Sequence, residues 1–512
     1  MSGNRGMIIK ASSVIMAVTI LAKIVGFVRE QVIAHQFGAT GLTDAYVSAQ
    51  AIPLLITSLI GGALSAALLP VFAGYLARKQ EETGWQLAGT VLSLAFAGLT
   101  LITIIGIPAA PWIVRLWVPD MNPALQTTTA FLLQVMLPGI VFSSLSIIAS
   151  ILLNAHNRFA VPAISPIVMN AIIIGSIFVL SKKYGIEGLA WGTVGGWLAQ
   201  LLWLVPFLRK VGFRFYRIAW RDLKFDLGEV FSLAWPLFFA TILTQLYVPV
   251  EKILGSRLDQ GSISALNYAL KLEQLPIAVF VTAVTTVVFP TLARHAADEN
   301  PEALTSALFS GLRLMCLVTL PVTGAILVLR VPLVQLAFER GAFTHQATLI
   351  TAGALALYTL GMTATAGVQI FSRSFYALRD SRSPLLISLL AAISYFGLAY
   401  LLTPSMAHEG LALANAAGLW INALVLYGLL YARLKPAEHG SFLMFLLKGL
   451  AASGLMAAAM FAVMEGLGSR GILIQLCAAS AVGGIVFAAA AYGLKLKEMR
   501  DLSALVLRRL GR

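Results

Sequence analysis

The chain has 512 residues, of which 59% are hydrophobic and only 11% are charged, and its mean hydropathy is +0.87. Soluble domains carry about 25% charged residues, so this composition excludes a soluble protein and predicts an all-α polytopic membrane protein. The formal net charge of +14 does not indicate a nucleic-acid partner, because the basic residues gather in alternate connections between apolar segments.

Apolar segments long enough to cross a bilayer recur along the whole chain. We predict fourteen transmembrane helices, at 11–34, 42–76, 85–108, 126–151, 160–181, 187–208, 228–256, 262–292, 303–328, 345–376, 384–403, 410–432, 442–464 and 471–494. Most of the 36 Lys and Arg residues lie in one set of alternate connections, and this set includes both termini. The positive-inside rule therefore predicts that both termini are cytoplasmic.

Sequence similarity between the two halves predicts an internal duplication. "EGLAWGTVGGWLAQLLW" begins at Glu187 and "EGLALANAAGLWINALVLY" begins at Glu409, an offset of 222 residues that also relates Gly139 to Gly361. Because each copy holds an even number of spans, the two lobes are expected to be parallel, as in transporters that work by alternating access. The predicted domains are an N-terminal six-helix lobe (1–210), a basic amphipathic cytoplasmic linker (211–226), a C-terminal six-helix lobe (227–432), and two extra helices with a basic cytoplasmic tail (433–512).

Charged residues inside the apolar windows are the candidates for function. A charge at the centre of a membrane helix costs about 2.5 to 3.5 kcal/mol on insertion scales, so such residues face water, a partner or a ligand. The candidate substrate-binding residues lie on the first two helices of each copy: Lys23, Arg29, Asp44, Lys271 and Glu273. A wet cleft between the lobes with cations on its floor suits phosphate oxygens. The alternative interpretation is that the cations snorkel to an interface or form internal ion pairs.

Motifs of membrane enzymes are absent from the sequence. It contains neither the HExxH of metalloproteases nor the Gly-rich phosphate-binding loop of ATPases, and its two cysteines, Cys316 and Cys477, lack metal-ligand spacing. We therefore expect no catalytic residues, no metal and no cofactor.

Four stretches together resemble the MurJ (MviN) family of lipid II flippases, in the superfamily that also contains MATE exporters and polysaccharide flippases. They are "KIVGFVREQVIAHQFGATGLTDAY", "LLNAHNRFAVPAISPIVMN", "FERGAFT" and "FYALRDSRSP". The resemblance implies a lipid II flippase of the bacterial cytoplasmic membrane, which moves an undecaprenyl-pyrophosphate-linked glycan from the inner to the outer leaflet for peptidoglycan synthesis. It places Lys23 and Arg29 on two essential arginines of the first helix. Asp44 falls on an acidic position of the second helix, and Lys271 on a basic position of the eighth.

The sequence also departs from the family pattern. The stretch "PLLITSLIGGALS" lacks the two arginines and the Glu that family members carry after the proline of the second helix, and Lys stands for Arg at 23 and 271. Lysine keeps the charge but cannot bind phosphate in a bidentate way. The expected partners are an anionic lipid-linked glycan and membrane lipids, with no nucleic acid, and we expect a monomer. Two alternatives are a flippase for another polyprenyl-pyrophosphate-linked oligosaccharide and a MATE-like cation-coupled exporter.

Overall fold

The computed structural model describes residues 2–213, 224–281, 291–292, 294–295, 298, 300–435, 438–468, 470–496 and 498–499. Within these ranges every regular element is a helix, which confirms the predicted fold class. The chain forms two compact units, Met1–Ser264 and Ala265–Arg512.

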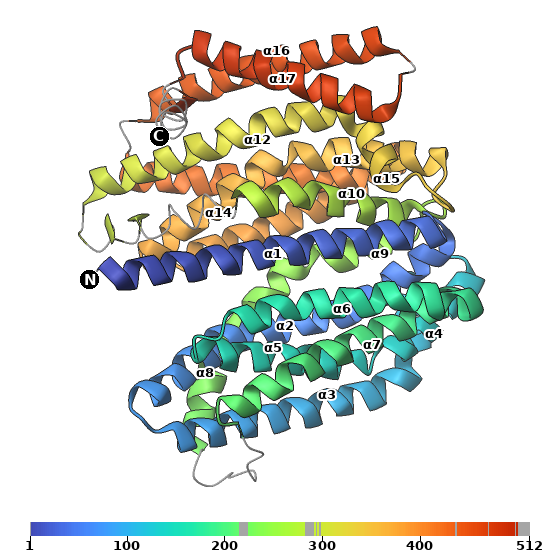
Figure 1. The fold of residues 1–512 in the computed structure, drawn as a ribbon, viewed down its shortest axis with the longest axis vertical. Coiled ribbons are helices and arrows are strands. Elements are labelled where there is room, and N and C mark those ends of the chain that lie inside the picture. Colours follow the sequence, from blue (N-terminus) through green and yellow to red (C-terminus); the bar gives the residue numbers. More distant parts are fainter. Residues whose placement is uncertain are drawn as a thin grey trace. The chain divides into compact units, whose positions relative to one another are not determined.

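The first unit is built around α2. Its helices are α1 (Ser2–Phe37), α2 (Gly41–Ala77), α3 (Glu81–Trp117), α4 (Pro123–Met136), α5 (Gly139–Ala155), α6 (Ala160–Val179), α7 (Ser181–Lys210), α8 (Lys224–Gln245) and α9 (Tyr247–Gly255). α2 packs against α4, α5 and α8, while α7 packs against α5 and α6, and α1 lies along α6 (Figure 1). The α1–α6 contact places the ions of the first helix beside the polar residues of α6.

The second unit is built around α12. Its helices are α10 (Ser262–Pro276, which begins at the end of the first unit), a π-helical turn η1 (Ile277–Val281), α12 (Pro301–Phe338), α13 (His345–Leu360), α14 (Met362–Ala377), α15 (Arg382–Leu434), α16 (His439–Leu467) and α17 (Ile472–Gly493). α12 packs against α13, α14, α16 and α17, and α15 packs against α13 and α14 (Figure 1).

The same backbone irregularities occur in both units at an offset of 222 residues. Gly185 in α7 has φ 56° and ψ −134°, and Ala407 in α15 has φ 50° and ψ −130°. Each kink is followed by a glycine, Gly188 or Gly410, at which a Cβ would lie 2.6 Å from the backbone of the preceding segment. This shared geometry supports an origin of the two halves by duplication, since an alanine rarely adopts a positive φ without strain.

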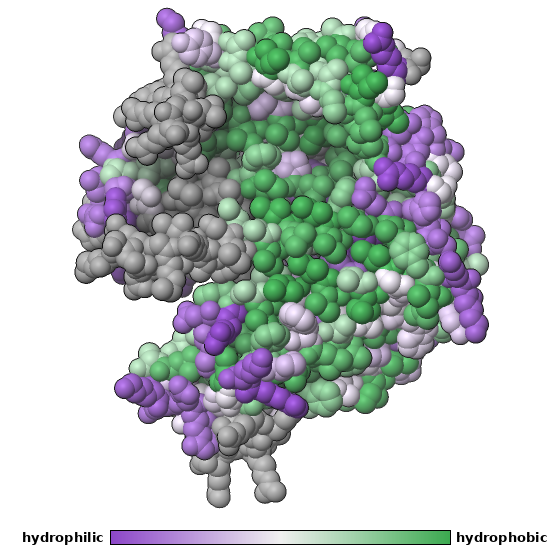
Figure 2. All heavy atoms as spheres, in the orientation of Figure 1, coloured by the Kyte–Doolittle hydropathy of each residue, from purple (hydrophilic) through white to green (hydrophobic). Residues whose placement is uncertain are grey.

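Most of the predicted membrane segments correspond to these helices, and residues 282–290 of the predicted segment 262–292 lie outside the described part of the chain. In the described part of the chain ten helices are long and apolar enough to cross a membrane, or eleven if the pair α4 and α5, bent by 44°, is one span. The 53-residue α15 contains two predicted segments, separated at the Ala407 kink. Hydrophobic residues cover the middle of the helices on the face shown in Figure 2, and hydrophilic residues gather near helix ends. This is the pattern of a multi-pass membrane protein.

Two parts of the predicted domain division lie outside the described residues. They are most of the linker at 211–226, of which 214–223 are not described, and the end of the basic tail, 500–512. The compact units and the repeated lobes divide the chain differently, because α8 and α9 belong to the first unit by packing and to the second copy by sequence. The lobe boundaries therefore stay a prediction.

Candidate functional site

Arg29 lies at the contact between α1 and α6. Its Nη1 donates a hydrogen bond of 3.0 Å to Oδ1 of Asn170, and its Nη2 forms an ion pair with Oε1 of Glu30. The side chain of Arg29 is 15% exposed, and that of Glu30 is 7% exposed. The positive charge is therefore paired and mostly buried, with limited contact with solvent.

A second set of hydrogen bonds joins α2 to α7 close to this pair. The hydroxyl groups of Tyr46 and Thr193 are 2.9 Å apart, and Nε2 of Gln50 donates to the Tyr46 hydroxyl at 3.0 Å. Tyr46 is buried, and it lies close enough to Arg29 and Glu30 for electrostatic interaction. Four helices, α1, α2, α6 and α7, thus contribute to one polar cluster inside the first unit.

The sequence analysis did not identify Asn170, Tyr46, Gln50 or Thr193. One signal was present, since Tyr46 and Gln50 are four residues apart and therefore share a face of α2. The partner of Arg29 on α6 is 141 residues away in the sequence, so it becomes visible only when the helices are packed. Lys23 lies earlier on α1 and is exposed.

Asp44 binds the beginning of α10 through both carboxylate oxygens. Oδ2 accepts a hydrogen bond from the backbone N–H of Gly261 at 2.5 Å, and Oδ1 accepts one from the N–H of Ser264 at 2.6 Å. The carboxylate is buried and satisfies backbone donors that a helix start leaves without an intrahelical partner. Gly261 has φ 94°, and a Cβ there would lie 2.5 Å from the carbonyl oxygen of Ala39. This geometry gives Asp44 a structural role, and direct contact with substrate stays a prediction.

Lys271 and Glu273 both lie on α10, in the second unit. Glu273 is 5% exposed, whereas Lys271 is half-buried. Residues two apart on an α-helix point about 200° apart, because each residue turns the helix by about 100°. These two side chains therefore lie on different faces of α10.

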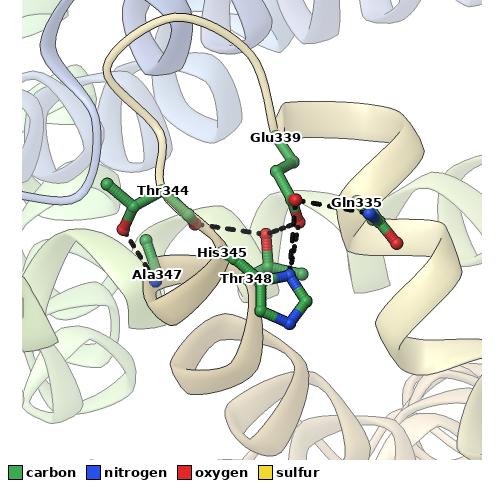
Figure 3. A network of polar contacts seen from close by, with 6 residues as sticks. All are labelled: Gln335, Glu339, Thr344, His345, Ala347 and Thr348. Atoms are coloured by element: carbon green, nitrogen blue, oxygen red, sulfur yellow. Dashed lines mark hydrogen bonds and ion pairs between the residues drawn. The ribbon is translucent and has the colours of Figure 1, made fainter.

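The "FERGAFT" segment forms a hydrogen-bonded connection between α12 and α13. Glu339 accepts hydrogen bonds from the hydroxyl of Thr348 at 2.7 Å and from Nε2 of Gln335 at 3.3 Å, and Nδ1 of His345 lies 3.1 Å from its carboxylate (Figure 3). Thr344 caps α13 through the N–H of Ala347. This family-like segment thus has a structural role, with one acid holding both helix ends.

A family model described as lipid II flippase MurJ matches residues 33–480. The chain belongs to the lipid II flippase MurJ family. The lipid II flippase MurJ of Burkholderia cenocepacia is 30% identical over 80% of this chain and 81% of the relative. A probable lipid II flippase MurJ of Buchnera aphidicola subsp. Acyrthosiphon pisum is 31% identical over 87% of this chain and 88% of the relative.

Solved structures agree with this membership in the MurJ family. A structure of lipid II flippase MurJ in an inward closed conformation has a TM-score of 0.80 and 25% identity, and covers 97% of this chain and 99% of that one. An inward-facing MATE multidrug transporter has a TM-score of 0.71 at 14% identity, covering 82% of this chain and 98% of that one. The MATE likeness concerns the fold alone. The resemblance found in the sequence is therefore confirmed, and the MurJ family is one of transporters.

Proposed function

We propose that this protein is a lipid II flippase that moves the undecaprenyl-pyrophosphate-linked glycan from the inner to the outer leaflet by alternating access. The observation that carries the proposal is the family match over residues 33–480. The glycan and pyrophosphate need such a path because they would lose water without replacement in hydrocarbon.

Three cations are proposed to bind the pyrophosphate: Lys23, Arg29 and Lys271. Of the three, Arg29 has a side chain held in one orientation, because Asn170 and Glu30 bind two of its guanidinium nitrogens. Exposed Lys23, on the same helix, supplies a mobile point charge. Glu273 and Asp44 complete the proposed site, with Asp44 acting through its hydrogen bonds to the start of α10.

Membrane potential is the proposed source of energy. Moving about two negative charges out of a cell whose interior is negative runs down the electrical gradient and releases roughly 4 to 5 kcal/mol per 100 mV. This would favour export without ATP.

We also propose that the protein is a monomer with both termini in the cytoplasm. The orientation is supported by the many basic residues in the terminal connections and in alternate loops. A reporter that is active on only one side of the membrane, fused after residue 512, tests it: activity outside the cell would reject this orientation.

Replacement of an essential lipid II flippase by this protein tests the function. We expect the wild type to restore growth, and the variants Lys23→Ala, Arg29→Ala and Lys271→Ala to fail although they insert normally. Lys183→Ala is the control, since Lys183 is exposed and lies against the ring of Tyr184, outside the proposed site. Failure of the wild type to restore growth, despite normal membrane insertion, would reject the proposal.

Arg29→Ala has a second effect that must be separated from the first. It leaves Glu30 buried without its partner, which alone can cost about 3 to 5 kcal/mol. The double variant Arg29→Gln with Glu30→Gln removes both charges and should fold better than Arg29→Ala. If this double variant inserts normally and restores growth, Arg29 does not bind substrate.

A further inference from the structure

An apolar groove opens between α2, α3 and α8 in the first unit, away from the polar cluster at Arg29. Its volume is about 700 Å³, within the range of roughly 300 to 1,000 Å³ typical of ligand pockets. Residues of three helices line the groove, among them Ala63 on α2, Ala95 and Gly98 on α3, and Phe231, Trp235 and Phe238 on α8. No charged residue lines the groove among the side chains that the structure describes.

The groove exists because α8 packs along α2 but has little close contact with α3. Gln245 donates a 2.7 Å hydrogen bond to Ser58, and a Cβ on Gly62 would lie 2.9 Å from the hydroxyl of Thr241. Towards the beginning of α8 the space against α2 and α3 is left open by small residues. A Cβ on Gly98 would meet no atom within 4 Å. The space is therefore a property of helix packing and of small side chains.

Aromatic side chains of α8 form one wall of the groove. The ring centroids of Phe231 and Trp235 are 5.6 Å apart with their planes at 26°, and these side chains are 64% and 52% exposed. Exposed aromatic and aliphatic surface on a membrane-spanning helix meets hydrocarbon, and an unfilled void beside it would lose dispersion contacts. The apolar occupant that this wall favours is a lipid hydrocarbon chain.

The end of the unit nearest the beginning of α8 is basic. A cluster of aromatic rings, in which Trp85 contacts Phe72, His156 and Phe213, joins the α2–α3 turn, the α5–α6 turn and the end of α7. Val230, which lines the groove, packs in the same hydrophobic cluster as Trp85. The exposed cations next to these aromatic residues are Arg78, Lys79, Arg158, Arg209 and Lys210, against the two acids Glu81 and Glu82. We call these five cations the basic rim.

We propose that the groove is a binding site for an anionic phospholipid, with an acyl chain between α2, α3 and α8 and the phosphate headgroup at the basic rim. The apolar lining selects the hydrocarbon chain, and the excess of cations over acids at one end selects the negative headgroup. This site is separate from the proposed pyrophosphate cations, and it does not depend on which glycan is transported.

Quenching of tryptophan fluorescence by brominated acyl chains tests the proposal directly. The purified full-length protein is reconstituted in vesicles containing dibrominated phosphatidylglycerol or dibrominated phosphatidylcholine, and the part due to Trp235 is obtained by comparison with Trp235→Phe. We expect half-maximal quenching of Trp235 at an about tenfold lower mole fraction of the anionic lipid. Equal quenching by the two lipids would overturn the anionic headgroup, and quenching of Trp235 no stronger than expected from bulk lipid would overturn the site.

Filling the groove provides a matched test. Gly98→Leu projects into open space and should remove the preferential quenching, whereas Gly175→Leu on α6, which also has no atom within 4 Å of its Cβ and does not line the groove, should leave it unchanged. Arg78→Gln with Lys79→Gln should reduce the preference for phosphatidylglycerol while keeping quenching by both lipids. If Gly98→Leu keeps the preferential quenching by dibrominated phosphatidylglycerol, the acyl chain does not lie in this groove.

Competition between unlabelled lipids identifies which kind of hydrocarbon chain occupies the groove. Unlabelled phosphatidylglycerol should relieve the quenching of Trp235 at lower mole fractions than polyprenyl phosphate does. Stronger displacement by polyprenyl phosphate would mean that the groove holds an isoprenoid tail and would overturn the phospholipid assignment.

Discussion

Substitution of Asp44 by Ala removes a buried acceptor that holds the beginning of α10. The carboxylate accepts two backbone hydrogen bonds, of 2.5 and 2.6 Å, and is 4% exposed. A hydrogen bond to a charged group contributes about 1.5 to 3 kcal/mol. At the lower value for each bond, Asp44→Ala should destabilise the protein by about 3 kcal/mol, roughly a 100-fold change in the unfolding equilibrium.

The assay is fluorescence-monitored unfolding of the purified protein in mixed micelles with an increasing fraction of denaturing detergent. Asp120→Ala is the control, because Asp120 forms a 2.9 Å ion pair with Arg257 while about half-exposed. Such an exposed pair contributes about 0 to 1 kcal/mol. Asp44→Asn, which keeps one acceptor oxygen, should fall between Asp44→Ala and the wild type.

A specific result would refute this reasoning about Asp44. If Asp44→Ala unfolds at the same midpoint as Asp120→Ala, the two backbone hydrogen bonds do not stabilise the fold. If Asp44→Ala is as stable as the wild type and yet fails to support growth, Asp44 acts on the substrate instead of on the start of α10.

Two further predictions concern helix packing and pH. Gly188→Ala and Gly410→Ala should each destabilise the protein by about 1 to 3 kcal/mol in the same unfolding assay, because a Cβ would lie 2.6 Å from backbone atoms. Gly175→Ala is the control and should not destabilise it, because a Cβ there meets no atom within 4 Å. Equal unfolding midpoints for the three variants would contradict the close approach of the backbone at Gly188 and Gly410. Hydrogen bonds from Ser383 hold the pKa of Asp380 below its usual range. The ionised carboxylate therefore stabilises the fold at pH values above its unfolded pKa of about 3.9, and this stabilisation is lost as the pH falls through the lower pKa of the folded state. Below pH 4 the unfolding midpoint should therefore fall more for the wild type than for Asp380→Asn.

The membrane helices and the repeat could be predicted from the sequence because they depend on local composition. Apolar segments of transmembrane length mark the spans, and the break between α4 and α5 falls where a proline, Pro138, precedes Gly139. The break near Ala407 was predicted as well, as a gap between two membrane segments, and Pro404 lies beside it. The positive φ of Ala407 itself has no local signal, since alanine favours a regular helix. It becomes predictable only through the 222-residue offset to Gly185, a residue that tolerates positive φ.

The candidate site was predicted as a list of charges, without their partners. The sequence indicated that Arg29 and Asp44 were expensive to bury, and this identified them as candidates. Their partners lie 141 residues away for Arg29, and 217 and 220 residues away for Asp44. Which of the many polar residues at such distances becomes a partner is decided by tertiary packing, which a single sequence does not encode locally.

The most direct test of the account measures on which side of the membrane lipid II lies. In cells whose own lipid II flippase is replaced by this protein, a lipid II-cleaving enzyme that cannot cross the membrane is added outside, and the cleaved fraction is measured. We expect cleavage with the wild-type protein and protection with the variant Lys23→Ala. Protection of lipid II in cells that carry the correctly inserted wild-type protein would contradict the account.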